Sequence, residues 1–282
     1  MSAPVRTPRR ARTRALLAVV LLPAVLLAAG CTADEREPES PAASSAPKPT
    51  ATAVPLPADG ACYRLSFNDV LAPSTQAEEV RCSAEHTSMT FAVGTLDRVV
   101  DGHLLAVDSD RVLDRLAERC PDRLADLVGG TREEARLSML RPVWFTPTLA
   151  QADAGADWFR CDVIAVAGQE RLAPLPRRLA GVLDSDEGRR RWGMCGTDEP
   201  DSADFERVLC SAPHSWRAIA VVAFEAGDYP GEDVVRDRGQ TPCEDAGREV
   251  ADDALNFQWG YEWPTREQWA SGQTYGRCWA PD

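Results

Sequence analysis

Two copies of one stretch decide how this chain folds: VRCSAEHTSMTFAV at residues 80–93 and VLCSAPHSWRAIAV at residues 208–221. The valine, the Cys-Ser-Ala triplet, the histidine and the closing Ala-Val recur without a gap. Each copy ends in a run rich in β-branched and aromatic residues, which predicts buried strands over residues 88–96 and 216–224. The chain after residue 58 therefore divides into two repeats built around these strands.

The ends of the two repeats also match. Residues 144–161 and 261–278 align over eighteen positions, and both segments end in Arg-Cys. Each segment contains a Thr-x-x-Gln capping box, which predicts the start of a short helix, and a glycine that ends it. An aromatic residue then enters a strand that we expect to end at the cysteine. These residues are Thr148, Gln151, Gly155 and Trp158 in the first repeat, and Thr265, Gln268, Gly272 and Tyr275 in the second.

One longer helix is expected between the strands of each repeat. In the first repeat, a stripe of apolar residues at helical spacing runs from Val112 to Cys120, and Pro121 should break or restart that helix. In the second repeat, Thr241 reads as the cap and Pro242 as the first helical residue of a helix that continues to about Leu255.

The N-terminal thirty residues are typical of a secretory signal. They contain five arginines, no acid, and an apolar run over residues 15–29 that is shorter than the roughly 20 residues of a membrane-spanning helix. Small residues precede Cys31, as in a relaxed bacterial lipobox. We therefore expect lipid on Cys31 to anchor the mature chain to the outer face of the cytoplasmic membrane. A cleaved signal with a stray thiol at Cys31 is the alternative.

Composition supports an exported protein on a tether. Residues 31–58 are rich in proline, alanine and serine, and they cannot bury enough surface to fold. We predict a signal peptide at 1–30, a disordered tether at 31–58, and repeats at 59–180 and 181–282. Without its first thirty residues the chain has 26 basic and 44 acidic residues, a formal charge of −18. Such a surface repels polyanions, so nucleic acid is a poor partner.

Eight cysteines follow the tether, four in each repeat. In an exported chain they predict four disulfides, and pairing within a repeat leaves three connectivities for each. We favour the first cysteine with the second and the third with the fourth. The predicted fold class is α+β: two tandem small disulfide-stapled domains, each a mainly antiparallel sheet with one main helix. The cysteines are Cys62, Cys82, Cys120 and Cys161, then Cys195, Cys210, Cys243 and Cys278.

The order of motifs in the second repeat resembles the septum-formation domain family of actinobacterial envelope proteins. The motifs are Gly-x-Cys at residue 195, Cys-Ser-Ala-Pro-His at 210–214, Tyr-Pro-Gly at 229–231, a helical cysteine at 243, and Trp-x-x-Gly-x-x-x-x-Arg-Cys at 269–278. The resemblance implies an exported or membrane-attached protein associated with septum formation, and no reaction. Members often carry glutamate three residues after the histidine, where this chain has Met89 and Arg217.

The histidines of the two copies are the best polar candidates for a site. His86 or His214 could act as a base or a ligand, or could simply bond a turn carbonyl and set the entry of the strand. Six of the eight tryptophans lie in the second repeat. Rigid aromatic residues there predict a binding surface formed by Trp259, Tyr261 and Trp263. No Cys-x-x-Cys pattern is present and export favours oxidised cysteines, so we expect no metal. We also expect no cofactor.

No nucleophile–base pair is visible in either repeat. We therefore expect an extracytoplasmic, lipid-anchored lipoprotein that acts as a non-catalytic binding or scaffold module of the cell envelope. Its expected partners are the membrane, through Cys31, and an envelope protein or cell-wall glycan. The alternative hypothesis is a hydrolase-type enzyme that acts on envelope material through His86 or His214.

Overall fold

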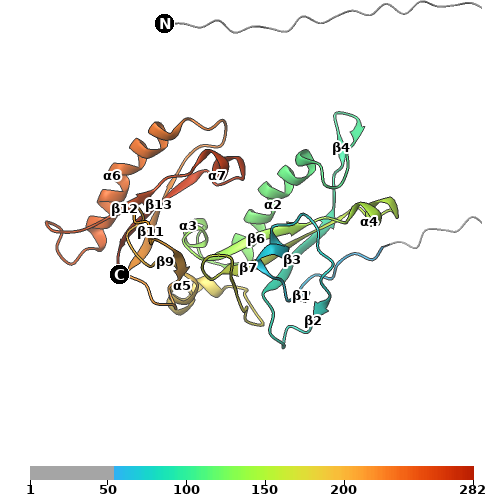
Figure 1. Cartoon of the computed structure of the whole chain (residues 1–282), viewed down its shortest axis with the longest axis horizontal. Coiled ribbons are helices and arrows are strands. Elements are labelled where there is room, and N and C mark those ends of the chain that lie inside the picture. The colour runs from blue at the N-terminus through green and yellow to red at the C-terminus, as the bar shows by residue number, and fades with distance from the viewer. Residues whose placement is uncertain (1–53) are drawn as a thin grey trace, which may run out of the picture. The chain divides into compact units, whose positions relative to one another are not determined.

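Two large antiparallel sheets, each with one long helix against it, make up most of the described part of the chain (Figure 1). The structure, a computed structural model, describes residues 54–282. The predicted signal peptide, Cys31 and the tether up to residue 53 lie outside these residues. None of the helices of residues 54–282 has the length and apolar character needed to cross a membrane.

The first sheet has the strand order β2-β1-β3-β7-β6, and β8 pairs with β7. All its pairs are antiparallel, and β3 is the strand predicted from the first copy of the repeated stretch. A separate hairpin, β4 and β5, precedes the long helix of this half. The strands are β1 (Cys62–Tyr63), β2 (Glu79–Val80), β3 (Ser88–Thr95), β4 (Val99–Val100), β5 (His103–Leu104), β6 (Leu140–Phe145), β7 (Trp158–Val166) and β8 (Leu172–Ala173).

The second sheet repeats this topology in the order β10-β9-β11-β13-β12. Even an irregularity recurs, because the register shifts between Thr90 and Ala92 on β3 and between the corresponding Ala218 and Ala220 on β11. Strands β7 and β13, which carry the last cysteine of each half, continue past that cysteine, contrary to the prediction that they would end there. The strands are β9 (Met194–Gly196), β10 (Arg207–Leu209), β11 (Trp216–Ala223), β12 (Gly260–Glu262) and β13 (Tyr275–Pro281).

The two long helices, α2 (Asp110–Val128) and α6 (Glu232–Val250), have the same length, and both run through a proline. The predicted break at Pro121 and the predicted helix start at Pro242 are therefore wrong. A proline inside a helix costs about 3 kcal/mol. In each helix the buried stripe continues on both sides of the proline, and an adjacent cysteine is bonded to the sheet, so tertiary packing outweighs this cost.

Short helices close the remaining turns. The capping boxes predicted at Thr148 and Thr265 are present: each threonine hydroxyl accepts the N–H three residues on, and each glutamine side chain reaches back to the threonine N–H. Gly155 and Gly272 follow these helices with φ of 96° and 91°, a conformation that favours glycine. The helices are α1 (Phe67–Val70), α3 (Arg132–Arg136), α4 (Leu149–Asp153), α5 (Asp186–Trp192) and α7 (Arg266–Ala270), with a 3₁₀ turn at Val182–Asp184.

Four disulfides tie the sheets and helices together, in the pairing that the sequence favoured. In each half, one bond links the first strand to the turn before the histidine, and the other links the long helix to a central strand of the sheet, β7 or β13. The pairs are Cys62–Cys82, Cys120–Cys161, Cys195–Cys210 and Cys243–Cys278.

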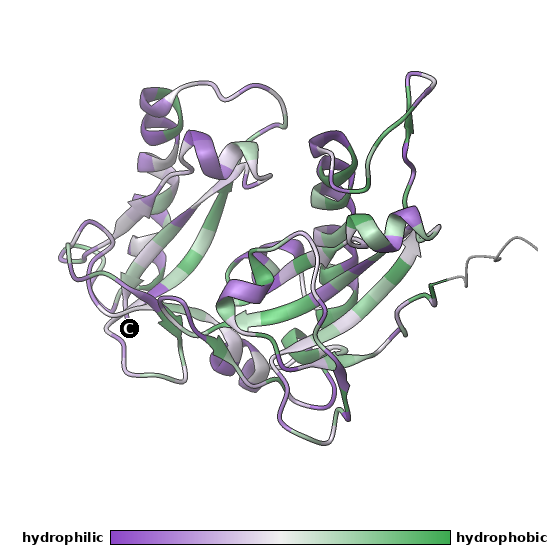
Figure 2. Ribbon diagram, turned by 45° about the vertical axis from the view of Figure 1, so that its right-hand side comes forward, coloured by the Kyte–Doolittle hydropathy of each residue, from purple (hydrophilic) through white to green (hydrophobic). Residues whose placement is uncertain are grey.

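The two halves share a core. The largest cluster of buried hydrophobic residues includes Leu140 and Val163 of the first sheet and Trp216 and Trp279 of the second. Hydrophobic residues alternate with more hydrophilic ones along the strands, and the long helices carry hydrophilic residues on part of their surface (Figure 2). The described residues accordingly belong to one compact unit.

Backbone pairing joins the halves at the start of the second repeat. Met139 donates its N–H to the carbonyl of Trp192 at 2.7 Å, and Met194 donates its N–H to the carbonyl of Leu137 at 2.8 Å. The segment before β6 thus runs antiparallel to the segment before β9, with Ser138 opposite Gly193. Side chains of both halves, including Met139 and Met194, pack together in the shared core beside this pairing.

Candidate functional site

The two histidines of the repeated stretch make the same local contact. The Nδ1 of His86 bonds the carbonyl of Ala84 at 2.9 Å, and the Nδ1 of His214 bonds the carbonyl of Ala212 at 2.7 Å. A carbonyl oxygen can only accept, so Nδ1 carries the hydrogen in both rings. The N–H of each alanine in turn donates to the backbone carbonyl of the residue before the cysteine, Arg81 or Leu209. The histidine therefore closes a tight turn and sets the entry of β3 or β11.

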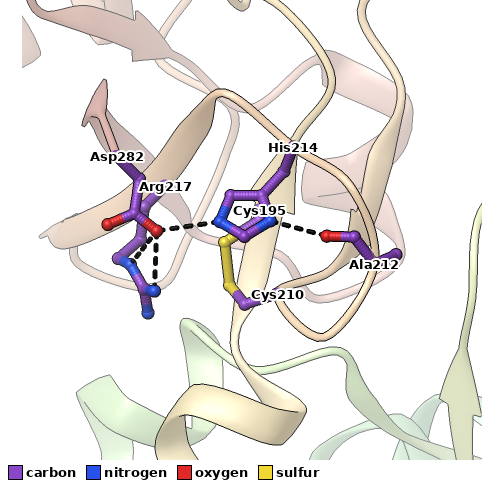
Figure 3. Close-up of a disulfide and its surroundings, with 6 residues drawn as sticks. All are labelled: Cys195, Cys210, Ala212, His214, Arg217 and Asp282. Carbon is purple, nitrogen blue, oxygen red and sulfur yellow. Dashed lines mark hydrogen bonds and ion pairs between the residues drawn. A yellow bond between two sulfur atoms is a disulfide. The ribbon is translucent and has the colours of Figure 1, made fainter.

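His214 has a second partner that the sequence does not place near it. Its Nε2 lies 2.8 Å from the Oδ2 of Asp282, which follows β13 (Figure 3). Arg217 donates to the same oxygen through Nη2 at 2.7 Å and Nε at 3.0 Å. These hydrogen bonds, first that of Arg217 and then that of His214, hold the pKa of Asp282 below its usual value despite partial burial.

The carboxylate that the sequence seemed to lack is thus supplied from 68 residues away. Antiparallel pairing of β11 with β13 places Trp216 opposite Pro281, and this register brings Asp282 beside the turn. The arginine at the position of the expected glutamate binds this carboxylate. When protonated, His214 donates one ring N–H to a carbonyl and the other to Asp282, which leaves no ring nitrogen to take a proton from a nucleophile.

The Cys195–Cys210 disulfide argues against zinc binding by Cys195, His214 and Asp282, the group of residues best placed to hold a metal ion. The Sγ of Cys195 and ligand atoms of His214 and Asp282 all lie within 4.8 Å of one another. Zinc binds thiolate sulfur, and here the Cys195 sulfur is bonded to Cys210. The arrangement in Figure 3 is therefore a disulfide braced by a histidine–carboxylate–arginine network, and its residues do not fit a metal ion.

His86 occupies a closed position. The residue is 1% exposed, and its Nε2 has no hydrogen-bond partner in the described chain. Its backbone carbonyl accepts the N–H of Leu175, a residue of the segment after β8. Met89 lies on β3 where Arg217 lies on β11. The ring of His86 is therefore closed off from solvent in this structure.

The predicted aromatic surface is largely core. Tyr261 is 5% exposed and donates its hydroxyl to the carbonyl of Val235 at 3.0 Å, so its assignment as an exposed binding residue is wrong. Burial raises the pKa of Tyr261 to about 12. Trp259 and Trp263 are half-buried and pack against the cluster of Tyr261 and the Cys243–Cys278 disulfide. Helix α6 covers this side of the sheet. The strand β12 has only three residues, so its sequence pattern could not indicate which side chains are buried.

A buried ion pair in the first sheet also escaped sequence reasoning. Arg160, directly before Cys161, lies 3.4 Å from Asp162, and both side chains are buried. Asp162 accepts hydrogen bonds from the hydroxyls of Ser88 and Thr90 at 2.9 and 2.7 Å. Burial raises the pKa of Asp162, while Arg160 and the two hydroxyls oppose this rise. The guanidinium also lies 3.8 Å from the ring centre of Tyr63, so the group is fully enclosed by protein.

Comparison with known proteins gives one match. The model of a family described as septum formation matches residues 59–278 as a single stretch that spans both sheets and all four disulfides. No curated protein and no solved structure matches the chain. A match over most of the described residues, from β1 to the last disulfide, shows that this chain belongs to the septum formation family.

Proposed function

We propose that this protein is a non-catalytic binding module of the cell envelope, held at the outer face of the cytoplasmic membrane by lipid on Cys31. Membership of the septum formation family supports a role in the envelope. The basic and apolar leader that ends at Gly30 supports export, and four disulfides fit an oxidising compartment.

The main support for a non-catalytic role is that the ring nitrogens of the two histidines are bonded within the protein or buried. The Nδ1 of each is committed to a turn carbonyl, the Nε2 of His214 faces a carboxylate, and His86 is buried. A general base needs a ring nitrogen within reach of the proton that it takes. Neither histidine offers one in this arrangement, which favours binding over catalysis.

A duplicated architecture is part of the proposal. The two sheets have matching strand orders, matching disulfides and matching long helices, which supports an origin from two copies of one unit, at residues 59–180 and 181–282. The partner of such a module is an envelope protein or a cell-wall glycan.

A hydrolase-type enzyme remains the second hypothesis because of one specific pair. His214 and Asp282 form a histidine–carboxylate contact whose side chains are 18% and 33% exposed. If this pair were catalytic, His214→Gln would abolish hydrolysis of purified cell-wall material while leaving the fold intact. The binding role predicts no His214-dependent hydrolysis in the same assay.

Lipid anchoring has a direct test. Membrane and soluble fractions of cells that produce the wild type or Cys31→Ala should differ, with wild type in the membrane fraction and the variant released or left as an unprocessed precursor. Mass spectrometry of the mature N-terminal peptide should find a diacylglyceryl group on Cys31. Equal processing and equal retention of the variant would refute the anchor.

A further inference from the structure

A cavity of ≈ 360 Å³ lies where the two halves meet, and three arginines line it. Arg141 comes from β6 of the first sheet, whereas Arg207 and Arg277 come from β10 and β13 of the second. In a chain with a large excess of acidic residues, three guanidinium groups around one cavity are unexpected. The acidic partners of these arginines show whether the protein itself already neutralises their positive charge.

Arg207 and Arg277 share one carboxylate. The Nε of Arg207 donates to the Oε2 of Glu262 at 3.3 Å, and its Nη2 contacts Oε1. The Nη1 of Arg277 lies 3.7 Å from the same Oε2. The side chain of Arg277 is only 4% exposed, and its other contacts are neutral, namely the carbonyl of Arg136 and the hydroxyl of Tyr275. Two cations thus share a single negative charge.

Arg141 has no acidic partner among the described residues. Its Nη1 donates to the carbonyls of Ser138 and Leu140, both at 2.7 Å, and no acceptor in residues 54–282 takes its Nε or Nη2. Burial, and then the charge of Arg277, lower the pKa of Arg141 to about 10. Burial, followed by the charges of Arg277 and Arg141, likewise lowers the pKa of Arg207 to about 10. The positive charge of Arg277 therefore disfavours the charged forms of both Arg141 and Arg207.

A polar side chain beside the arginines can donate to the same ligand. Gln268 lines the cavity, and its Oε1 is occupied by the N–H of Thr265 in the capping box of α7. The amide group of Gln268 is thereby oriented, and its NH₂ has no acceptor in the part of the chain that the structure describes. Glu170 and Glu206 also line the cavity without forming ion pairs with the arginines, and they disfavour a ligand of high negative charge.

We infer that this cavity binds a small phosphate monoester through Arg141, Arg207, Arg277 and Gln268. Planar guanidinium groups match the oxygens of phosphate in fork-like pairs, and an oxyanion would supply the negative charge that the cluster lacks. The volume accepts a phosphoryl group with a small substituent, and a single phosphoryl group limits repulsion from the two glutamates. This inference extends the proposed binding role by naming a ligand class, and it does not depend on lipid anchoring.

The test is calorimetric titration of the full chain, purified in detergent, with inorganic phosphate and with glycerol phosphate. We expect saturable binding at one site. Arg141→Gln should weaken the affinity about ten- to hundredfold, the loss expected for one charge-assisted hydrogen bond. Arg123→Gln is the matched control, because Arg123 is an exposed arginine of α2 outside the cavity, and it should bind as the wild type does.

Glu262→Gln provides a test in the opposite direction. Among residues 54–282, Glu262 carries the one carboxylate that pairs with the cluster, and the variant removes its charge. Phosphate should therefore raise the melting temperature of Glu262→Gln by more than it raises that of the wild type. The absence of saturable phosphate binding by the folded wild type would overturn the inference, as would equal affinity in Arg141→Gln. Either result would leave the membrane anchor and the non-catalytic role untouched, since those rest on fractionation and hydrolysis assays.

Discussion

Replacing Gly239 with alanine should reverse the usual effect of that substitution in a helix. Gly239 lies in the middle of α6, where helix propensity alone predicts that alanine stabilises the protein by about 1 kcal/mol. The ring of Tyr261 lies directly against this glycine, well inside the space that a Cβ would need. The close approach of helix and sheet at this point requires a residue without a side chain.

The ring has no room to move away. On the β13 side, a Cβ on Gly276 would lie 2.6 Å from the ring, so the backbone there already touches it. The hydroxyl is held by the carbonyl of Val235 at 3.0 Å. Overpacking a filled core costs about 1–3 kcal/mol, and displacement of the ring adds about 1 kcal/mol for the lost hydrogen bond. After the gain in propensity, we expect a net loss of about 1–3 kcal/mol.

Chemical denaturation of the oxidised full chain in detergent, followed by tryptophan fluorescence, measures this change. Gln240→Ala on the exposed face of the same helix is the control and should stay within about 0.5 kcal/mol of wild type. In a Tyr261→Ala background the obstacle is absent, so Gly239→Ala should become stabilising by up to about 1 kcal/mol. If Gly239→Ala stabilises the protein with Tyr261 intact, the packing described for α6 is wrong.

Three further predictions follow from the disulfides, the aromatic cluster and Asp282. Replacing both Cys195 and Cys210 with serine should cost about 3 kcal/mol in the chain-entropy model for a loop of 15 residues, measurable by denaturation under oxidising conditions. Trp263→Ala should lower the melting temperature, because this residue packs on the buried cluster; an unchanged melting temperature would restore a surface role. Because the folded-state pKa of Asp282 is depressed, its contribution is complete above the unfolded value of about 3.9 and is lost as the pH falls through the lower folded value. The stability gap between wild type and Asp282→Asn should therefore close below about pH 4 in a pH series of denaturation curves, and solvent screening keeps it under about 1 kcal/mol.

Features encoded within a few adjacent residues could be read from the sequence. The strands at residues 88–96 and 216–224, the capping boxes at Thr148 and Thr265, and the correspondence of the eight cysteines all emerged from local patterns and from the repeat. Strand propensity and cap chemistry act over one to four residues, so local sequence is sufficient to predict them. One of the alternatives predicted from the sequence was that each histidine bonds a turn carbonyl, and this contact is also local.

Tertiary structure decided the features that depend on register and on close approach. Helix α6 continues through Pro242 because buried residues pack on both sides of the proline and the adjacent Cys243 is bonded to β13, which local propensity cannot predict. Asp282 meets His214 only because β11 and β13 pair in one register, and Tyr261 is buried only because α6 comes within contact of β12. Contacts between residues tens of positions apart have no local signature. The same holds for Arg141, because the other two arginines of its cavity, Arg207 and Arg277, come from the second sheet.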